Sequence, residues 1–354
     1  MSGATPTIRD VARLAGVSKS TASRVLSGAE TSIPISTGTR QHVLRAAEEL
    51  GYRPHRGARA LSGKNSHLIG VIVRETDDPW FGYLIDVISH AAKDRGYDLV
   101  LGNARRDPQE ALALRNTMLD MRYCDGLLLC GDLQESPEDQ QLLQTMGQDR
   151  RLISVSRGSR ELSCRIPYVG VDNRAGTCLA LEHLWNLGHR RIACISSDRV
   201  GDLADRVDAF CQFMAVLGAI VPPELLLIEE HSFDGGYRAA GRLWRLVSPP
   251  TAIFGAADCL AVGALASLLD MGVAVPQEAS VAGFDDLSFS RFVRPALTTV
   301  HEPVEEIGRR AVELITSVVE GRDGHEGDCP QFLLEPRLVV RSSTGPAPSV
   351  KREA

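Results

Sequence analysis

Residues 7–28 read TIRDVARLAGVSKSTASRVLSG, and this stretch decides how the N-terminal part of the chain folds. Thr7 and Asp10 have the Thr-x-x-acid spacing of a helix start, apolar residues follow at helical spacing, and Gly16 favours a helix end. Ser18 can cap a second helix, in which apolar residues such as Ala22 turn inward and polar residues stay outside. Two short helices joined by a Gly-containing turn predict a helix-turn-helix.

A third amphipathic helix is expected from about Thr39 to Leu50, with Gly51 ending it. Its apolar residues complete a small three-helix core. We therefore predict an all-α headpiece over residues 1–54.

From residue 67 onward, apolar strand-length runs alternate with helix-length amphipathic segments. This rhythm is typical of βαβ units and a parallel, doubly wound sheet. The runs form two sets, which predict two α/β lobes with a cleft between them, the usual place for a small ligand. The expected strands are 68–73, 97–102, 125–130 and 151–155 in the first set and 168–171, 191–196, 224–230, 251–255 and 280–284 in the second.

The composition is that of an ordinary folded protein. At 354 residues the chain exceeds what one core normally supports, and 44% hydrophobic with 24% charged residues argues against disorder. Neither a membrane helix nor a signal peptide is evident, so we expect a cytoplasmic protein without membrane contact. The eight cysteines form no C-x-x-C pair, which predicts reduced thiols, with no metal site and no cofactor.

Charge is distributed unevenly along the chain. Residues 1–66 hold ten Lys/Arg against four Asp/Glu, a net charge of +6, whereas the other 288 residues hold 29 against 41, a net charge of −12. A small basic head on a large acidic body indicates a nucleic-acid reader joined to a second function.

Four stretches together resemble the LacI/GalR family of bacterial transcription regulators: residues 7–28, 50–73, 181–195 and 280–300. The resemblance implies a helix-turn-helix headpiece, a hinge helix, and a core similar to periplasmic sugar-binding proteins. On this basis the headpiece is 1–54, the hinge 55–66 and the core 67–341. Lobe 1 is placed at 67–171 and 300–330, lobe 2 at 172–298 and 331–341, and a disordered tail at 342–354.

A helix in the major groove needs hydrogen-bond donors on its outward face, and Lys19, Ser20 and Arg24 occupy that face of the second helix. The resemblance places the same three residues where the family reads bases. It places six further residues at positions that usually touch phosphate: Thr7, Ser18, Thr21, Ser23, Ser36 and Thr39. The alternative is a solvated polar helix face.

The hinge is basic and contains Gly57, which disfavours a helix in isolation. By resemblance, Ala58 and Leu61 belong to the minor-groove hinge, with Leu61 wedging between base pairs; otherwise Leu61 is a linker residue. Because a single hinge has little partner surface, a homodimer on a palindromic double-stranded DNA operator is expected.

Sugars are bound by charged side chains beside an aromatic face. The resemblance assigns Arg206 and Asp285 to the positions that most often hold the effector. The full candidate set is Asp78, Trp80, Phe81, Arg157, Arg206, Asp258 and Asp285. Their structural alternatives are a surface ion pair for Arg206, a helix cap for Asp258, core packing for Trp80 and Phe81, and an ordinary loop residue for Arg157.

The candidate cleft departs from the family pattern at several positions. Asp78 replaces the usual Asn before Pro79, Ala257 stands where Asn often precedes Asp258, and Ser156 replaces the acid before Arg157. These changes argue against a standard hexose as the ligand.

We therefore expect a dimeric repressor whose operator affinity is controlled by a small molecule, a carbohydrate or derivative, bound between the lobes. One alternative is a DNA-binding regulator controlled by a protein partner. Another is a cytoplasmic sugar-binding protein or enzyme, which the basic head and the missing catalytic motifs oppose; we expect no catalytic residues.

Overall fold

The computed structural model describes residues 6–27, 34–52, 65–132, 146, 149–156, 166–197, 201–322 and 329–348. The chain consists of two compact units, residues 1–66 and residues 67–354. In the described ranges, no helix is both long and apolar enough to span a membrane.

Over residues 6–27 and 34–52, the first unit contains three helices, α1 (Ile8–Leu14), α2 (Lys19–Ser27) and α3 (Thr37–Glu49). The predicted helix-turn-helix is therefore present, and the third helix begins two residues before its predicted start. Apolar side chains from all three helices form one small core, whose buried members are Val11, Ala12, Ala22, Val25, Val43, Ala46 and Ala47.

A residue with a side-chain hydroxyl directly precedes each of these helices: Thr7, Ser18 and Ser36. The Thr7 hydroxyl donates to the Asp10 carboxylate, and the Ser18 and Ser36 oxygens accept from the backbone N–H three residues later, each at 3.1 Å. Gly16 adopts a φ of 64° between α1 and α2, a conformation that glycine tolerates best. The turn is thus encoded by its own residues, as the sequence predicted.

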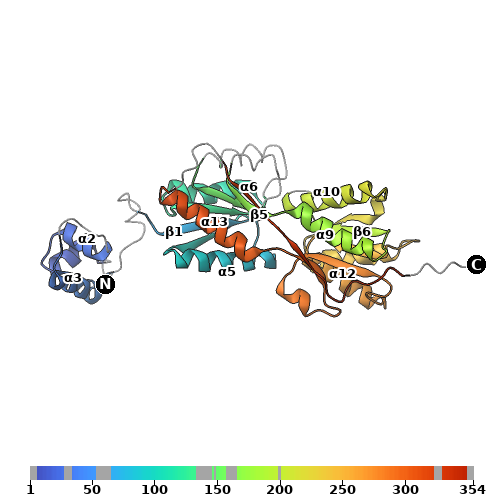
Figure 1. Cartoon of the computed structure of the whole chain (residues 1–354). Helices are drawn as coiled ribbons and strands as arrows, with labels where there is room; N and C mark the ends of the chain where they lie inside the picture. The colour runs from blue at the N-terminus through green and yellow to red at the C-terminus, as the bar shows by residue number, and fades with distance from the viewer. Residues whose placement is uncertain are drawn as a thin grey trace, which may run out of the picture. The chain divides into compact units, whose positions relative to one another are not determined.

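The first lobe is a six-stranded sheet in the order β11-β5-β4-β3-β1-β2, all parallel. Its strands are β1 (Leu68–Val73), β2 (Asp98–Asn103), β3 (Gly126–Cys130), β4 (Leu152–Val155), β5 (Tyr168–Val171) and β11 (Gln331–Leu334). In the described residues, its helices with assigned bounds are α5 (Pro79–Asp94), α6 (Pro108–Arg115), the π-helical turn η1 (Asn116–Asp120) and α13 (Val304–Val319). α13 packs along α5 and over β3, β4 and β5 (Figure 1).

The second lobe repeats this plan in the order β12-β10-β9-β8-β6-β7, with only β12 antiparallel to its neighbour. Its strands are β6 (Ile192–Ser196), β7 (Leu226–Ile228), β8 (Ala252–Gly255), β9 (Ser280–Asp285), β10 (Thr298–His301) and β12 (Arg337–Val339). Its helices are α9 (Asn173–Asn186), α10 (Gly201–Val216), α11 (Phe233–Trp244) and α12 (Asp258–Asp270), with short 3-10 turns η2 (Pro223–Leu225) and η3 (Ser288–Arg291). Two doubly wound lobes are confirmed.

The chain passes between the lobes three times: from β5 to α9, from β10 to α13, and from β11 to β12. The predicted lobe boundary at residues 330/331 is wrong, because β11 pairs in parallel with β5 of lobe 1, with Phe332 opposite Val169. The predicted start of the lobe 1 segment at residue 300 is also early, since His301 still pairs with Asp285 of lobe 2.

Residues 342–348 pack on lobe 2, so the prediction of a disordered tail from Ser342 is wrong for this part. Ser343 is fully buried, and its hydroxyl donates to the Val281 carbonyl at 2.6 Å. The Gly345 carbonyl accepts from His189 Nε2 at 3.0 Å, and the Ala347 N–H donates to the Leu187 carbonyl at 2.8 Å. Backbone pairing therefore continues past β12 despite the Pro- and Ser-rich sequence.

His189 anchors this segment and has a structural role. The side chain is fully buried, with Nδ1 2.9 Å from the Thr251 hydroxyl and Nε2 3.0 Å from the Ser280 hydroxyl. Burial is the main cause of the lowered pKa of His189, so the imidazole is neutral in the folded protein.

We predict that His189→Ala lowers the free energy of unfolding by about 2–4 kcal/mol, because it leaves buried hydrogen-bonding groups unsatisfied. Urea denaturation measures this directly. The matched control is His90→Ala, at an exposed position on α5, where a change within about 0.5 kcal/mol is expected. Equal effects of the two substitutions would contradict the anchoring role.

Candidate functional site

The outward face of α2 carries the residues predicted to read DNA bases. Lys19, Ser20 and Arg24 are exposed, whereas Ala22 and Val25 on the opposite face are buried in the headpiece core. The helix therefore presents two cationic side chains and a hydroxyl to solvent, which are groups suited to base edges in a major groove.

Most of the hydroxyls predicted to contact phosphate lie at helix starts. Ser18 Oγ lies 2.8 Å from the hydroxyls of both Ser20 and Thr21, and Ser36 Oγ lies 2.9 Å from that of Thr39. Thr7 caps α1, and Ser23 is half-buried within α2. Three further predicted residues, Ala58, Leu61 and Arg157, lie outside the described residues.

A pocket lies between the two lobes, at the carboxyl ends of their strands. It holds about 470 Å³ of empty space, part of it open to solvent. Lobe 1 contributes Arg74, Asp78, Trp80, Phe81, Gly131, Asp132 and Ser156, while lobe 2 and its crossovers contribute Asp202, Leu203, Arg206, His231, Ala257, Asp285 and Glu302. The structure thus brings Asp78, Trp80, Phe81, Arg206 and Asp285 together, as predicted.

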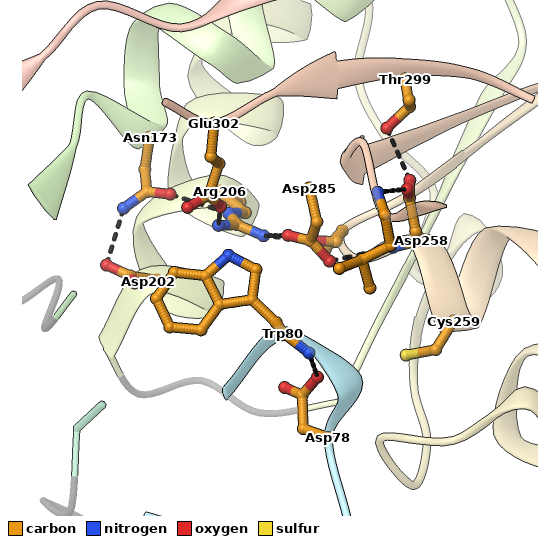
Figure 2. A network of polar contacts seen from close by, with 12 residues as sticks. Asp78, Trp80, Asn173, Asp202, Arg206, Asp258, Cys259, Asp285, Thr299 and Glu302 are labelled. Carbon is orange, nitrogen blue, oxygen red and sulfur yellow. Dashed lines mark hydrogen bonds and ion pairs between the residues drawn. The ribbon is translucent and has the colours of Figure 1, made fainter. Parts of the chain in front are cut away.

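Arg206 is the centre of this pocket. The side chain on α10 is buried, and its guanidinium donates to Asn173 Oδ1 at 2.8 Å, to the Ala256 carbonyl at 2.8 Å, and to Asp285 Oδ1 at 2.9 Å. It also donates to Glu302, and it lies 3.6 Å from the ring centroid of Phe284. Figure 2 shows Asn173, Glu302 and Asp285 converging on this one group. Arg206 therefore ties together the ends of β8 and β9 and two of the interlobe crossovers.

One guanidinium here lies near three carboxylates, those of the buried Asp285 and Glu302 and that of the half-buried Asp202. Burial raises the pKa of Asp202 and Asp285, the latter to about 6, and raises that of Glu302 well above its usual range, although Arg206 opposes each shift. A single positive charge cannot fully offset three neighbouring negative charges in a buried site. The cluster is therefore suited to accept hydrogen-bond donors or to hold a proton.

Among the described residues, three buried polar atoms around this pocket have no hydrogen-bond partner: Trp80 Nε1, Ser156 Oγ and Glu302 Oε2. They offer a donor, a hydroxyl and an acceptor to whatever enters the pocket. Two pocket residues also have unusual backbone conformations, with φ of 48° at Ser156 and 115° at Asp285. Such strain in non-glycine residues is concentrated at binding sites.

Asp258 does not belong to the pocket, and its prediction as a ligand contact is wrong. Its fully buried carboxylate accepts from the Leu287 N–H at 2.9 Å and from the Ser290 and Thr299 hydroxyls, each at 2.5 Å. A side chain at Gly283 would come within 2.4 Å of this carboxylate, so glycine leaves the room it needs. Asp258 joins α12 to the loop after β9 and to β10, and its side chain does not cap α12.

Sequence reasoning missed several pocket residues. Glu302 follows β10, a short strand that had not been predicted, and His231 is a single histidine in a loop. Asp202 lies in the first turn of α10, and Arg74 and Asp132 closely follow the ends of β1 and β3; none of the three belongs to a recognisable motif. Only their position at the carboxyl ends of strands, where parallel sheets bind ligands, could have indicated them.

Comparisons with known proteins decide the family. Residues 7–55 match the family model described as bacterial regulatory proteins, lacI family, and residues 181–344 match a periplasmic binding protein-like domain. The transcriptional repressor CytR of Escherichia coli K12 is 32% identical over 349 residues, covering 97% of each chain. The chain belongs to the LacI family of bacterial regulatory proteins.

Other relatives are similar over nearly the whole length. The regulator GalR of Escherichia coli K12 is 32% identical over 340 residues, covering 95% of each chain. Among solved structures, the Lac repressor dimer bound to operator and the anti-inducer ONPF has a TM-score of 0.84 at 25% identity, covering 97% of this chain and 100% of that one. A complex of the regulator CelR with cellobiose has a TM-score of 0.70 at 28% identity, covering 96% and 99%.

Family membership makes this chain a DNA-binding transcription regulator with two parallel α/β lobes, as the sequence predicted. Its relatives are regulators and not enzymes, which agrees with the predicted absence of catalysis.

For Asp258 we predict a purely structural effect. Asp258→Ala should lower the free energy of unfolding by at least about 2 kcal/mol, because three buried donors lose their acceptor. Chemical denaturation measures the effect, and Asp94→Ala, at an exposed position near the end of α5, is the control with little expected change. Unaltered stability in Asp258→Ala would argue that the carboxylate serves a ligand after all.

Proposed function

We propose that this protein is a homodimeric repressor that binds a palindromic operator and whose DNA affinity is controlled by a small polyhydroxylated ligand, a carbohydrate or derivative, in the pocket between its lobes. The observation that carries the proposal is the Arg206 cluster, because it combines a buried charged group with unpartnered polar atoms at the junction of two lobes.

DNA recognition is assigned to the exposed face of α2. Lys19, Ser20 and Arg24 would contact base edges, and the hydroxyls at the helix starts would position the headpiece on phosphates. These hydroxyls are Thr7, Ser18, Thr21, Ser23, Ser36 and Thr39. A two-fold operator follows from a homodimer, because each subunit presents the same helix to one half-site. The structure of the Lac repressor dimer bound to operator supports this arrangement by similarity.

The ligand class follows from the pocket chemistry. Trp80 and Phe81, 7% and 4% exposed, supply aromatic surface, while Ser156, Glu302 and Asp285 supply hydroxyl and carboxylate groups. Aromatic surface beside directed polar groups suits a ring that is apolar on its faces and hydroxylated at its edge. The cellobiose complex of CelR is consistent with such a ligand.

Control of DNA binding requires that the ligand prefer one arrangement of the lobes. Arg206 holds residues of two interlobe crossovers, Asn173 and Glu302, so a ligand that changes its hydrogen bonds biases the angle between the lobes. Coupling free energies in such systems are typically about 1–3 kcal/mol, enough to change operator affinity between roughly 5- and 150-fold.

We predict that Arg24→Ala lowers the ratio of operator to non-specific DNA affinity by roughly 5- to 150-fold, the loss of about 1–3 kcal/mol of base discrimination. Fluorescence anisotropy on an operator selected from random DNA gives the ratio. Arg45→Ala, which removes an exposed arginine from α3, should leave the ratio unchanged. If Arg24→Ala keeps its sequence discrimination, α2 is not the reading helix.

We also predict that a thermal-shift screen of sugars, sugar acids, sugar phosphates and nucleosides identifies a stabilising compound. A ligand at 100 times its Kd adds about 2.7 kcal/mol to the stability of the native state. Asp285→Asn should abolish the shift and preserve DNA binding, since the headpiece is a separate compact unit. A screen without any shift would contradict small-molecule control and favour a protein partner.

A further inference from the structure

An ion pair between two residues that line the pocket joins the two lobes. Asp78 precedes α5 in lobe 1, and His231 lies between β7 and α11 in lobe 2. His231 Nε2 lies 3.2 Å from Asp78 Oδ2, and the two side chains are 6% and 12% exposed. The pair is therefore buried and links elements that separate when the lobes move apart.

Both nitrogens of His231 have partners. Nδ1 lies 3.0 Å from the Ser197 hydroxyl, and Nε2 faces the Asp78 carboxylate and the Cys259 sulfur, the latter at 3.5 Å. Burial raises the pKa of the Cys259 thiol, so Cys259 stays protonated and Asp78 supplies the negative charge. An imidazolium that donates from both nitrogens satisfies this arrangement.

The titratable groups that face His231 come from three elements: Asp78 from the start of α5, Cys259 from α12 and, at longer range, Asp285 from the end of β9. Arg74, at the end of β1, acts on Asp78. Burial opposes charge on His231, but the interactions with Asp78 and Cys259 outweigh it and raise the pKa of His231 well above its usual value. Burial likewise opposes charge on Asp78, but His231 holds its pKa low.

We infer that Asp78 and His231 form a proton-dependent latch that holds the two lobes closed over the pocket, so that Asp78 acts on the partner lobe and not chiefly on the ligand. The inference rests on the proposed function only in assigning a ligand to this pocket. The latch explains the acid at position 78, because an asparagine would cap α5 equally well through the Trp80 N–H but would carry no charge.

The direction of the pH dependence follows from the two states of the cleft. In an open cleft His231 loses Asp78 and keeps only its uncharged neighbours from lobe 2, so it should titrate nearer its ordinary value of about 6.5, whereas in the closed cleft it remains protonated to higher pH. Closure therefore takes up a proton above about pH 6.5. The ratio of closed to open molecules should fall by up to tenfold for each pH unit as the pH rises from there toward the closed-state pKa.

Trp80 reports on closure, because its indole lies in the pocket. In the intact protein carrying Trp185→Phe and Trp244→Phe, acrylamide quenching of Trp80 fluorescence should be weak at pH 6 and several-fold stronger at pH 9. Asp78→Asn keeps the helix cap and should remove this pH dependence, as should His231→Gln. The matched control is Asp77→Asn, which removes the exposed neighbouring acid and should behave as the parent protein does.

Quenching that is the same at pH 6 and pH 9 in the parent protein, or a pH dependence that persists in Asp78→Asn, would overturn the latch. Neither result touches the proposed function, which is tested by whether compounds in the thermal-shift screen stabilise the protein. The opposite combination is also informative. If quenching follows pH as predicted but no compound stabilises the protein, the latch stands and the proposed function is contradicted.

Discussion

The structure of the core depends on how one buried positive charge is satisfied. Arg206 has its guanidinium wholly within the protein, where an unpaired charge would be prohibitively costly. Two of its partners, Ala256 and Asp285, lie at the ends of β8 and β9. The other two, Asn173 at the start of α9 and Glu302 before α13, belong to interlobe crossovers. Satisfying one side chain therefore requires that strand ends and crossovers be correctly placed relative to one another.

The same constraint makes the site responsive. Three carboxylates lie around one guanidinium. Trp80, Ser156 and Glu302 each keep a buried polar atom without a partner in the part of the chain that the structure describes. A fully satisfied network would be rigid, whereas this one has unsatisfied groups that a ligand can complete. On our account, binding energy at these atoms is converted into a preference for one lobe arrangement, and the Asp78–His231 pair contributes to that preference from the other side of the pocket.

The sequence predicted the parts of the fold whose signals are local. All nine expected strands are present in the structure. They could be predicted because buried parallel strands appear in a sequence as continuous apolar runs, such as LIGVIV in β1. β10, β11 and β12 were missed because none of them is a buried apolar run: TTVH in β10 is largely polar, and β11 and β12 are only partly buried. The lobe boundary and the tail were wrong for a related reason: pairing of β11 with β5, and of Ser343 with Val281, joins residues far apart in the sequence.

The sequence predicted those residues of the candidate site that carry a local or family signal. Arg206 and Asp285 were found through family resemblance, and Asp78, Trp80 and Phe81 because charged and aromatic side chains suit a sugar ring. Asp258 was misplaced because an acid at a helix start is compatible with capping, ligand binding or a buried network, and only the positions of Ser290 and Thr299 distinguish them. Glu302 and His231 carry no local signal, since their importance arises from what the fold places opposite them.

The central claim is that a ligand at the Arg206 cluster changes how the headpiece engages DNA. Hydrogen exchange of the full protein on its selected operator, with and without a compound that stabilises it, tests this claim most directly. The account predicts that the compound protects the starts of α10 and α13 and the end of β9, and changes the operator-dependent protection of α2. Protection confined to another part of the core, or an unaltered α2, would contradict it.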